Sequence, residues 1–243
     1  MSRHTFYLPP EFFRSGKIII SGQDAFHISR VLRLKTGSSL HGITYDRRRL
    51  EMQIERTGKE IICRITGEET IKQQKKFFIS LALSCPRPAV LDSLVPKLAE
   101  LGCDLVQPLV TERCFSPSLA KFASGRYDRI AAQAVKHSGR TDPFLIKNPV
   151  ALNDFLNSTG PEYPGWNKFF PYEGETENSL ARSLEQTGNK AVFVIGPEGG
   201  FSCAEADKIK QAGFIPVSLG SNILKVETAA LFALISFINR QCS

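Results

Sequence analysis

The spacing of apolar residues changes near residue 75. Before that point, apolar side chains occupy every second position in three segments, 39–46, 49–56 and 60–69. This alternation is typical of strands that bury one face. Residues 17–21 add a short apolar strand, and several short strands separated by turns favour a small β-barrel. One short helix is expected from Asp24, its N-cap, to about residues 35–37.

From Phe77 onward, buried strands alternate with segments of helical spacing. Strands are expected at 77–84, 104–110, 167–173, 191–195 and 214–220, and helices at 88–102, 125–139, 178–188, 202–213 and from about 226. This order predicts an α/β domain with a parallel sheet. The change of pattern predicts two domains, residues 1–72 and residues 73–243.

Residues 191–200 carry the most informative local pattern. The apolar, β-branched run 191–195 leads directly into Gly196-Pro197-Glu198-Gly199-Gly200. Ser202 and Glu205 then fit a capping box that starts the next helix. Glycines allow a sharp turn and a close approach of a ligand, and ligands of open α/β sheets bind where strands end. A side chain at Gly199 is expected to fill this slot.

A second glycine loop follows the last predicted strand. Residues 215–219 lead into Gly220 and then into a C-terminal helix that is apolar on nearly every face from Ala229 to Ile238. Such a helix is either fully buried or part of a subunit interface. Two glycine loops after neighbouring strands predict a slot for a nucleotide-like ligand, although the chain lacks both G-x-G-x-x-G and a Walker lysine pattern.

The charge of the chain is concentrated in its first third. The net charge is +7, and residues 1–75 contain 14 Lys and Arg against 8 Asp and Glu, whereas the remainder contains 17 against 16. This imbalance favours a polyanionic partner. The six cysteines have no metal-ligand spacing, so they are interpreted as reduced thiols of a cytoplasmic protein. We expect no metal site, no signal peptide and no membrane span, since the most apolar stretch is too short to cross a bilayer.

Several motifs resemble those of one known family. IGPEGGFSCAE (195–205) and LGSNILKVETAALFAL (219–234), preceded by HISRVLRLKTG, KLAELGCDLVQPLVTER and AVKHSGRTDPF, resemble the ribosomal RNA small-subunit methyltransferase E family in the same order along the chain. That family belongs to the SPOUT class of trefoil-knotted methyltransferases. The resemblance implies an N-terminal PUA-like RNA-binding β-barrel, residues 1–72, and a knotted C-terminal domain, residues 73–243. It further implies bound S-adenosylmethionine, a homodimer, and methylation of N3 of one uridine in 16S rRNA of the small ribosomal subunit.

The resemblance also assigns residues to the cofactor. Small residues are needed there because side chains would occupy the slot. The implied cofactor-binding residues are Gly196, Pro197, Glu198, Gly199, Gly200, Leu219, Gly220, Asn222, Ile223, Leu224, Thr228 and Ala229.

Uridine N3 carries a proton that must leave before or during methyl transfer, so a base or a stabilising cation is expected. The catalytic candidates are Arg140, Lys225, Glu198 and Glu227. Alternatives remain open for three of them. Arg140 can form a surface ion pair with Asp142, Glu198 can bind loop amides, and Glu227 can stabilise a helix N-terminus.

The RNA-binding candidates lie in the first domain and beside Arg140. The family motif contains His27, Arg30, Arg33 and Lys35, whose cations can contact phosphates. Arg140 itself can orient the uracil or a phosphate. The run 47–49 is either a further phosphate contact or a solvated turn. His137 is either a general base or an exposed residue near a helix end.

This sequence departs from the family pattern at three places. Lys225-Val226 stands where the family has Arg-Thr, Lys136-His137 stands where it has Glu-Gln, and Arg87 lies where a family lysine is missing. Lysine keeps the charge of arginine but loses its planar fork. The alternatives are therefore a non-catalytic RNA-binding or ribosome-assembly factor that retains the fold, or a methyltransferase acting on another RNA.

Overall fold

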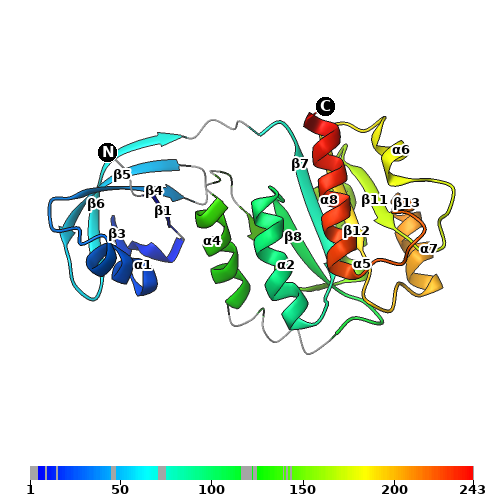
Figure 1. The fold of residues 1–243 in the computed structure, drawn as a ribbon, viewed down its shortest axis with the longest axis horizontal. Helices are drawn as coiled ribbons and strands as arrows, with labels where there is room; N and C mark the ends of the chain where they lie inside the picture. Colours follow the sequence, from blue (N-terminus) through cyan, green and yellow to red (C-terminus); the bar gives the residue numbers. More distant parts are fainter. Residues whose placement is uncertain are drawn as a thin grey trace. The chain divides into compact units, whose positions relative to one another are not determined.

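The computed structural model describes residues 5–8, 10–14, 16–44, 48–70, 75–115, 122, 125–138, 140, 142 and 144–242. The chain divides into two compact units. The first contains Met1–Gln74 and Val135–Pro143, and the second contains Lys75–Ala134 and Phe144–Ser243 (Figure 1). The division near residue 75 lies where the apolar spacing changes, but the segment 135–143 groups with the first unit rather than the second.

The N-terminal unit contains a six-stranded sheet. Its strands, in spatial order, are β1 (Thr5–Leu8), β4 (Ser39–Thr44), β5 (Arg48–Arg56), β6 (Ile61–Thr70), β3 (Lys17–Ile20) and β2 (Phe13–Arg14). β1 pairs with β4 in parallel, and the other neighbours are antiparallel. Among the described residues no pairing joins β1 to β2, so the closed barrel expected from the sequence is not seen.

The helical segment of this unit is shorter than expected. After the 3-10 turn Pro10–Phe12, α1 spans Gly22–Phe26 and continues as a π-helical turn, His27–Val31. Ala25 and Ile28 are buried in the core formed by the sheet. The segment ends before residues 35–37 because Arg33 adopts a φ of 52°, a left-handed conformation that a right-handed helix cannot include.

The C-terminal unit contains a parallel sheet. Its strands, in spatial order, are β10 (Val150–Ala151), β8 (Leu105–Val110), β7 (Phe78–Ser84), β12 (Lys190–Ile195), β11 (Asn167–Pro171) and β13 (Ile215–Val217), and β9 (Leu145–Ile146) also pairs with β8. All of these pairs are parallel. The α/β order of the sequence is therefore confirmed for this unit.

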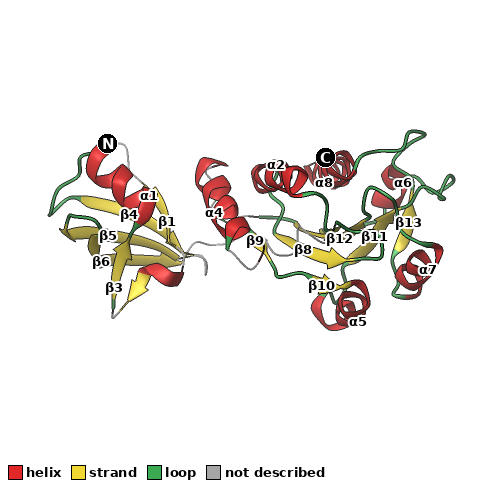
Figure 2. Cartoon of the chain, turned by 90° about the horizontal axis from the view of Figure 1, so that it is seen from below, coloured by secondary structure: helices red, strands yellow, loops and turns green. Residues whose placement is uncertain are grey.

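Helices cover both faces of this sheet, as Figure 2 shows. One face carries α2 (Pro88–Glu100), α6 (Leu180–Leu184) and α8 (Val226–Cys242), and the other carries α5 (Leu152–Glu162) and α7 (Cys203–Gln211). On β12, Val192 and Val194 belong to the cluster of α5 and α7, whereas the ring of Phe193 lies 6.4 Å from that of Phe237 in α8. Burial on both faces explains why β12 is a continuous apolar run.

Of two further helices, one matches the sequence prediction and the other does not. α4 spans Arg126–Ser138 and matches its expected range within one residue. α5 was not expected from the sequence, and its last turn contains Gly160 and Pro161, which disfavour helix. Leu152, Phe155 and Leu156 nevertheless bury its inner face, so tertiary packing stabilises a helix that local propensity does not indicate.

All six cysteines are free thiols, of which Cys63, Cys85 and Cys103 are buried. Burial raises the pKa of Cys63 and of Cys85 to about 12. In the part of the chain that the structure describes, no helix is long and apolar enough to span a membrane.

Candidate functional site

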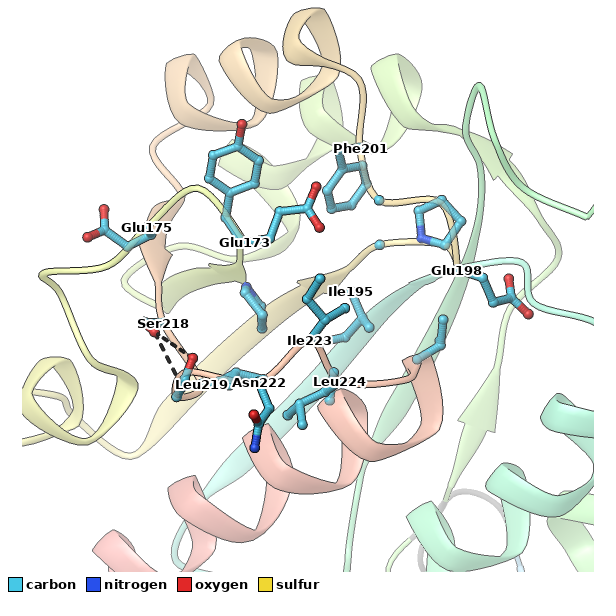
Figure 3. Close-up of a pocket in the computed structure, with 18 of the residues that line it drawn as sticks. Glu173, Glu175, Ile195, Glu198, Phe201, Ser218, Leu219, Asn222, Ile223 and Leu224 are labelled. Carbon is cyan, nitrogen blue, oxygen red and sulfur yellow. Dashed lines mark hydrogen bonds between the residues drawn. The ribbon is translucent and has the colours of Figure 1, made fainter.

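A pocket of about 170 Å³ opens at the carboxyl ends of β11, β12 and β13 (Figure 3). Because these three strands are parallel neighbours, the loops that follow them meet at one edge of the sheet. The pocket is lined by residues 171–173, 175, 195–198, 200, 201 and 218–224, together with Val226 and Ala229 of α8. This is the edge at which ligands of open α/β sheets bind.

The loop after β12 makes a tight turn. The amide of Gly200 donates to the carbonyl of Pro197 at 2.9 Å, and Gly200 has a φ of 67°. A Cβ atom at Gly200 would lie 3.2 Å from Oε1 of Glu173 across the pocket. The backbone conformation therefore favours glycine at this position, and a side chain there would also press on the Glu173 carboxylate.

The helix that follows this turn begins as the sequence predicts. Ser202 and Glu205 form a capping box at the start of α7. Glu205 is buried, and its Oε1 also accepts a hydrogen bond from the amide of Glu112 at 2.8 Å. Nη1 of Arg113 donates to the carbonyl of Gly199 at 2.8 Å. The turn after β8 is thus bound to the glycine loop through Gly199 and to the first turn of α7 through Glu205.

The loop after β13 forms the opposite wall. The Ser218 hydroxyl hydrogen-bonds with Gly220, whose φ is 120°. Ile223 is 87% exposed and lies beside Ile195 in Figure 3. The carbonyl of Lys225 accepts the amide of Ala229 at 2.8 Å, which starts α8. This wall therefore offers apolar side chains and backbone groups to a ligand.

A third wall was missed by the sequence reasoning. It follows β11 and includes Tyr172, Glu173 and Glu175. The amides of Asn178 and Glu177 lower the pKa of Glu175 below its ordinary value. The missing information was the strand order: β11 lies between β12 and β13, so its loop has to flank both glycine loops. The turn residue Gly174 after an apolar strand was the available signal.

Most of the residues expected to hold a cofactor come together in this pocket. The lining residues among them are Gly196, Pro197, Glu198, Gly200, Leu219, Gly220, Asn222, Ile223, Leu224 and Ala229. Gly199 and Thr228 do not line it. A Cβ atom at Gly199 would contact Cδ of Arg113 at 3.4 Å, so a side chain there points away from the slot, contrary to expectation.

The four catalytic candidates have different surroundings. Glu198 lines the pocket, and its carboxylate lies 3.6 Å from Nε of Arg87. Lys225 is exposed just before α8, and Glu227 is half-buried in the first turn of that helix. Arg140 belongs to the first unit, where its Nε donates to the carbonyl of Asp142 at 2.9 Å.

The RNA-binding candidates of the N-terminal unit are mostly exposed. Arg30, Arg33 and Lys35 are exposed, whereas His27 is half-buried with its ring against Phe6. In β5, Arg48 pairs with Glu68 and Arg49 pairs with Glu69. These ion pairs favour a structural role on the strand surface for both arginines over contact with RNA phosphates. Arg47 and the side chains of Lys136 and His137 lie outside the described residues. Within the described ranges, no group of three potential ligands could hold a metal ion.

Comparison with known proteins identifies the family. A model of the RNA methyltransferase domain matches residues 73–238. Ribosomal RNA small subunit methyltransferase E of Rickettsia conorii is 26% identical, with 96% of this chain and 94% of that protein covered, and that of Aquifex aeolicus is 27% identical, with 94% and 96% covered.

A solved structure shares the fold over almost the whole chain. A Legionella pneumophila protein described as a methyltransferase, in complex with its bound cofactor SAM, superimposes with a TM-score of 0.78 at 27% identity and 98% coverage of both chains. With its pocket at the carboxyl edge of a parallel sheet, this chain belongs to the RNA methyltransferase family that includes the ribosomal RNA small subunit methyltransferase E proteins.

Proposed function

We propose that this protein transfers a methyl group from S-adenosylmethionine to N3 of a specific uridine in 16S rRNA of the small ribosomal subunit. The observation that carries the proposal is the pocket formed by both glycine loops, in a chain of the RNA methyltransferase family. The uridine and its N3 atom follow from the family resemblance. The cytoplasm is the compartment that fits six free thiols and a ribosomal substrate.

The pocket residues suit an adenosyl group. Ile195, Leu219 and Leu224 supply apolar surface, and the loops supply backbone amides and carbonyls for a purine edge. Glu173 and Glu175 add carboxylates to a pocket that has no lysine or arginine in its lining. This charge complements the sulfonium and ammonium groups of S-adenosylmethionine.

The cofactor, when bound, supplies an electrophilic methyl group on a cationic sulfur, and the protein supplies orientation and charge. The uracil N3 proton has to pass to a base as the N–C bond forms. Glu198 and Glu227 are the acceptors that we propose for this proton. Lys225 is the cation that we propose to stabilise negative charge on the uracil oxygens. Arg140, which belongs to the first unit, stays a catalytic candidate from the family resemblance alone. Lys225 would act as a point charge, without the planar fork of an arginine.

The N-terminal unit is proposed to bind RNA, through the basic residues His27, Arg30, Arg33 and Lys35. A PUA-like fold for this unit and a trefoil knot in the C-terminal unit remain part of the proposal, supported by the family resemblance. The division of labour between residues 1–72 and 73–243 follows from the same resemblance and from the excess of Lys and Arg in the first third.

We further propose that the protein is a homodimer through the C-terminal unit. In α8, the side chains of Phe232 and Ile235 are 44% and 42% exposed. They are three residues apart and therefore lie on one face of the helix. A second copy that covers this face would remove both side chains from water. Sedimentation at micromolar concentration should give twice the 27.0 kDa chain mass, and a monomer would contradict this part of the proposal.

The test of function is methyl transfer to small ribosomal subunits isolated from a strain that lacks the modification. The proposal predicts one methylated uridine in 16S rRNA, with the label on N3 by nucleoside mass spectrometry. Methylation of another RNA would keep the chemistry and refute the substrate. Cofactor binding without transfer to this substrate would point to a methyltransferase that acts on another RNA. RNA binding without cofactor binding would instead support the alternative of a non-catalytic RNA-binding or assembly factor, which the substitution at Lys225-Val226 would then explain.

A further inference from the structure

One side of the helical segment in the N-terminal unit combines an aromatic ring with basic side chains. Phe26 is 63% exposed and Val31 is 58% exposed. Arg30, Arg33 and Lys35 are exposed as well. Residues four apart on an α-helix, and five apart across a π turn, lie on the same side. Phe26, Arg30 and Val31 therefore share one side, and the exposed Arg33 and Lys35 follow at the end of the segment. Phe26, Arg30, Arg33 and Lys35 are together called the basic-aromatic face.

The opposite side of the segment is firmly anchored. Ala25 and Ile28 are 2% and 0% exposed, and Leu32 and Leu34 pack against the same core. The helix thus has a separate apolar side that the fold buries. Phe26 lies outside that side, so burial in the core of its own unit does not explain a phenylalanine at this position.

The backbone departs from a regular helix within the same residues. The amide of Leu32 donates to the carbonyl of His27, five residues earlier, at 2.9 Å. Arg33 has a φ of 52°, and among the described residues no other non-glycine residue has a positive φ. π turns and strained conformations persist where the position of side chains matters for function. Here they set the positions of Arg30, Val31 and Arg33.

The charges on this face differ from those on the adjacent sheet. Lys17 pairs with Glu55 at 2.6 Å, and Arg48 pairs with Glu68 at 3.2 Å. Within the described ranges, no carboxylate lies within ion-pair distance of Arg30, Arg33 or Lys35. The sheet surface is therefore neutralised locally, and the basic-aromatic face keeps its positive charge for a partner.

We propose that the basic-aromatic face binds single-stranded RNA, with an unpaired base stacked on Phe26 and the adjoining phosphates contacting Arg30 and Arg33. The inference rests on the proposed function in taking RNA as the partner. An exposed ring suits a base that is free to stack, because the bases of a duplex are already stacked on one another. A protein partner could bury Phe26 and Val31 as well as RNA does. It would also have to neutralise the charges of Arg30, Arg33 and Lys35, which the phosphates of RNA neutralise directly.

The test is the affinity of the full chain for a single-stranded RNA of about 12 nucleotides, measured by fluorescence anisotropy over a range of salt. Phe26→Ala is expected to weaken binding about five- to 150-fold. Phe26→Tyr should bind like the wild type because it keeps the ring. Val31→Ala is the matched control, since Val31 lies on the same side of the segment but outside the basic-aromatic face. It removes exposed apolar surface without removing a ring, and it should change affinity less than about twofold.

The salt dependence separates stacking from charge. Phe26→Ala should leave the slope of log K against log salt unchanged, whereas Arg30→Ala should lower its magnitude by about 0.7. Arg49→Ala is the control for charge. Arg49 lies 3.6 Å from Glu69, so its loss should change both affinity and slope much less than the loss of Arg30.

Two results would overturn the inference. The first is an equal RNA affinity for Phe26→Ala and the wild type, and the second is an equal loss for Phe26→Tyr and Phe26→Ala. If Phe26 instead covers a second copy of the chain, Phe26→Ala would change the sedimentation and leave RNA affinity intact, which also overturns it. The proposed function fails separately: a wild type that binds RNA through Phe26 but transfers no methyl group refutes the function and leaves this site standing.

Discussion

The pocket of the C-terminal unit and the basic-aromatic face of the N-terminal unit are built in different ways. The pocket is built largely from backbone: two glycine loops, a turn closed by Gly200 and Pro197, and a capping box that holds the loop in place. The face is built from the tips of exposed side chains on one anchored helical segment. The pocket depends on the path of the backbone itself, whereas the face depends on which side chains the helical segment presents.

This difference predicts how each region responds to substitution. A backbone-built pocket should lose its ligand when a single glycine is changed, because the path itself changes. A side-chain surface should lose affinity in steps, with each residue contributing a ring or a charge.

Gly200→Val should abolish most of the cofactor affinity. Valine is strained at a φ of 67°, and its Cβ would lie 3.2 Å from Oε1 of Glu173. We expect binding of S-adenosylmethionine to weaken by about 10- to 100-fold or more in equilibrium dialysis. Gly199→Ala is the adjacent control, since its new methyl group contacts only Arg113. Equal losses for the two variants would contradict the assignment of Gly200 to the pocket wall.

Glu205→Ala should destabilise the C-terminal unit. The substitution removes the capping box of α7 and leaves the amide of Glu112 without its acceptor. We expect a loss of about 2–4 kcal/mol in the free energy of unfolding, measured by denaturant titration. Asp207→Ala lies on the exposed side of the same helix and should have little effect. A stability loss shared equally by both variants would show that the two hydrogen bonds contribute nothing.

High pH should destabilise both units through their buried thiols. The pKa of Cys63 in the N-terminal unit and of Cys85 in the C-terminal unit is raised from 9.0 to about 12 by burial. Since the unfolded thiols ionise near pH 9 and the folded ones near pH 12, this contribution to stability is complete below pH 9 and is lost as the pH rises toward 12.

The measurement is the free energy of unfolding between pH 8 and 11, about the range in which the unfolded thiols ionise. Cys63→Ala and Cys85→Ala should each reduce the pH dependence. Thiol alkylation at neutral pH tests the burial independently. Cys203 and Cys242 are exposed and should react before the buried Cys63 and Cys85. Rapid alkylation of Cys85 in the native protein would contradict its burial.

Glu173→Gln should have the smallest effect. Its carboxylate faces Gly200 across the pocket, and removing one charge near a cationic ligand changes the binding free energy by about 1 kcal/mol in a solvated site. S-adenosylmethionine should therefore bind about fivefold more weakly. S-adenosylhomocysteine lacks the positive charge on sulfur, so the substitution should change its affinity less. Glu177→Gln, outside the pocket lining, is the control. Equal effects on both ligands would exclude an interaction of Glu173 with the sulfonium charge.

The sequence predicted the backbone-built region best. The strand 191–195, the turn at 196–200 and the capping box of Ser202 and Glu205 are local patterns, and the structure confirms all three. The loop at 171–175 was missed because its relevance depends on β11 lying between β12 and β13, and strand order is a long-range property. α5 was missed because burial of Phe155 outweighs the helix-breaking Gly160 and Pro161.

In the N-terminal unit the sequence predicted strands but not their assembly. The expected alternation is confirmed in β5, where Leu50, Met52 and Ile54 are buried. In β6 it holds only from Ile61 to Cys63, since Ile65 is 38% exposed. Alternation does not specify which edges pair, so the expected barrel is an open path from β1 to β2 in the described residues. The exposure of Phe26 could not be predicted from the spacing of apolar residues either. The π turn that follows Phe26 changes the helical period.

Calorimetric titration of the wild-type chain with S-adenosylmethionine tests the central claim most directly. The claim is that the loops after β11, β12 and β13 form a cofactor site that does not depend on the basic-aromatic face. It predicts one site per chain, with the same affinity in Phe26→Ala and Arg30→Ala and a much lower affinity in Gly200→Val. No heat of binding in the wild type, or undiminished binding in Gly200→Val, would contradict the claim.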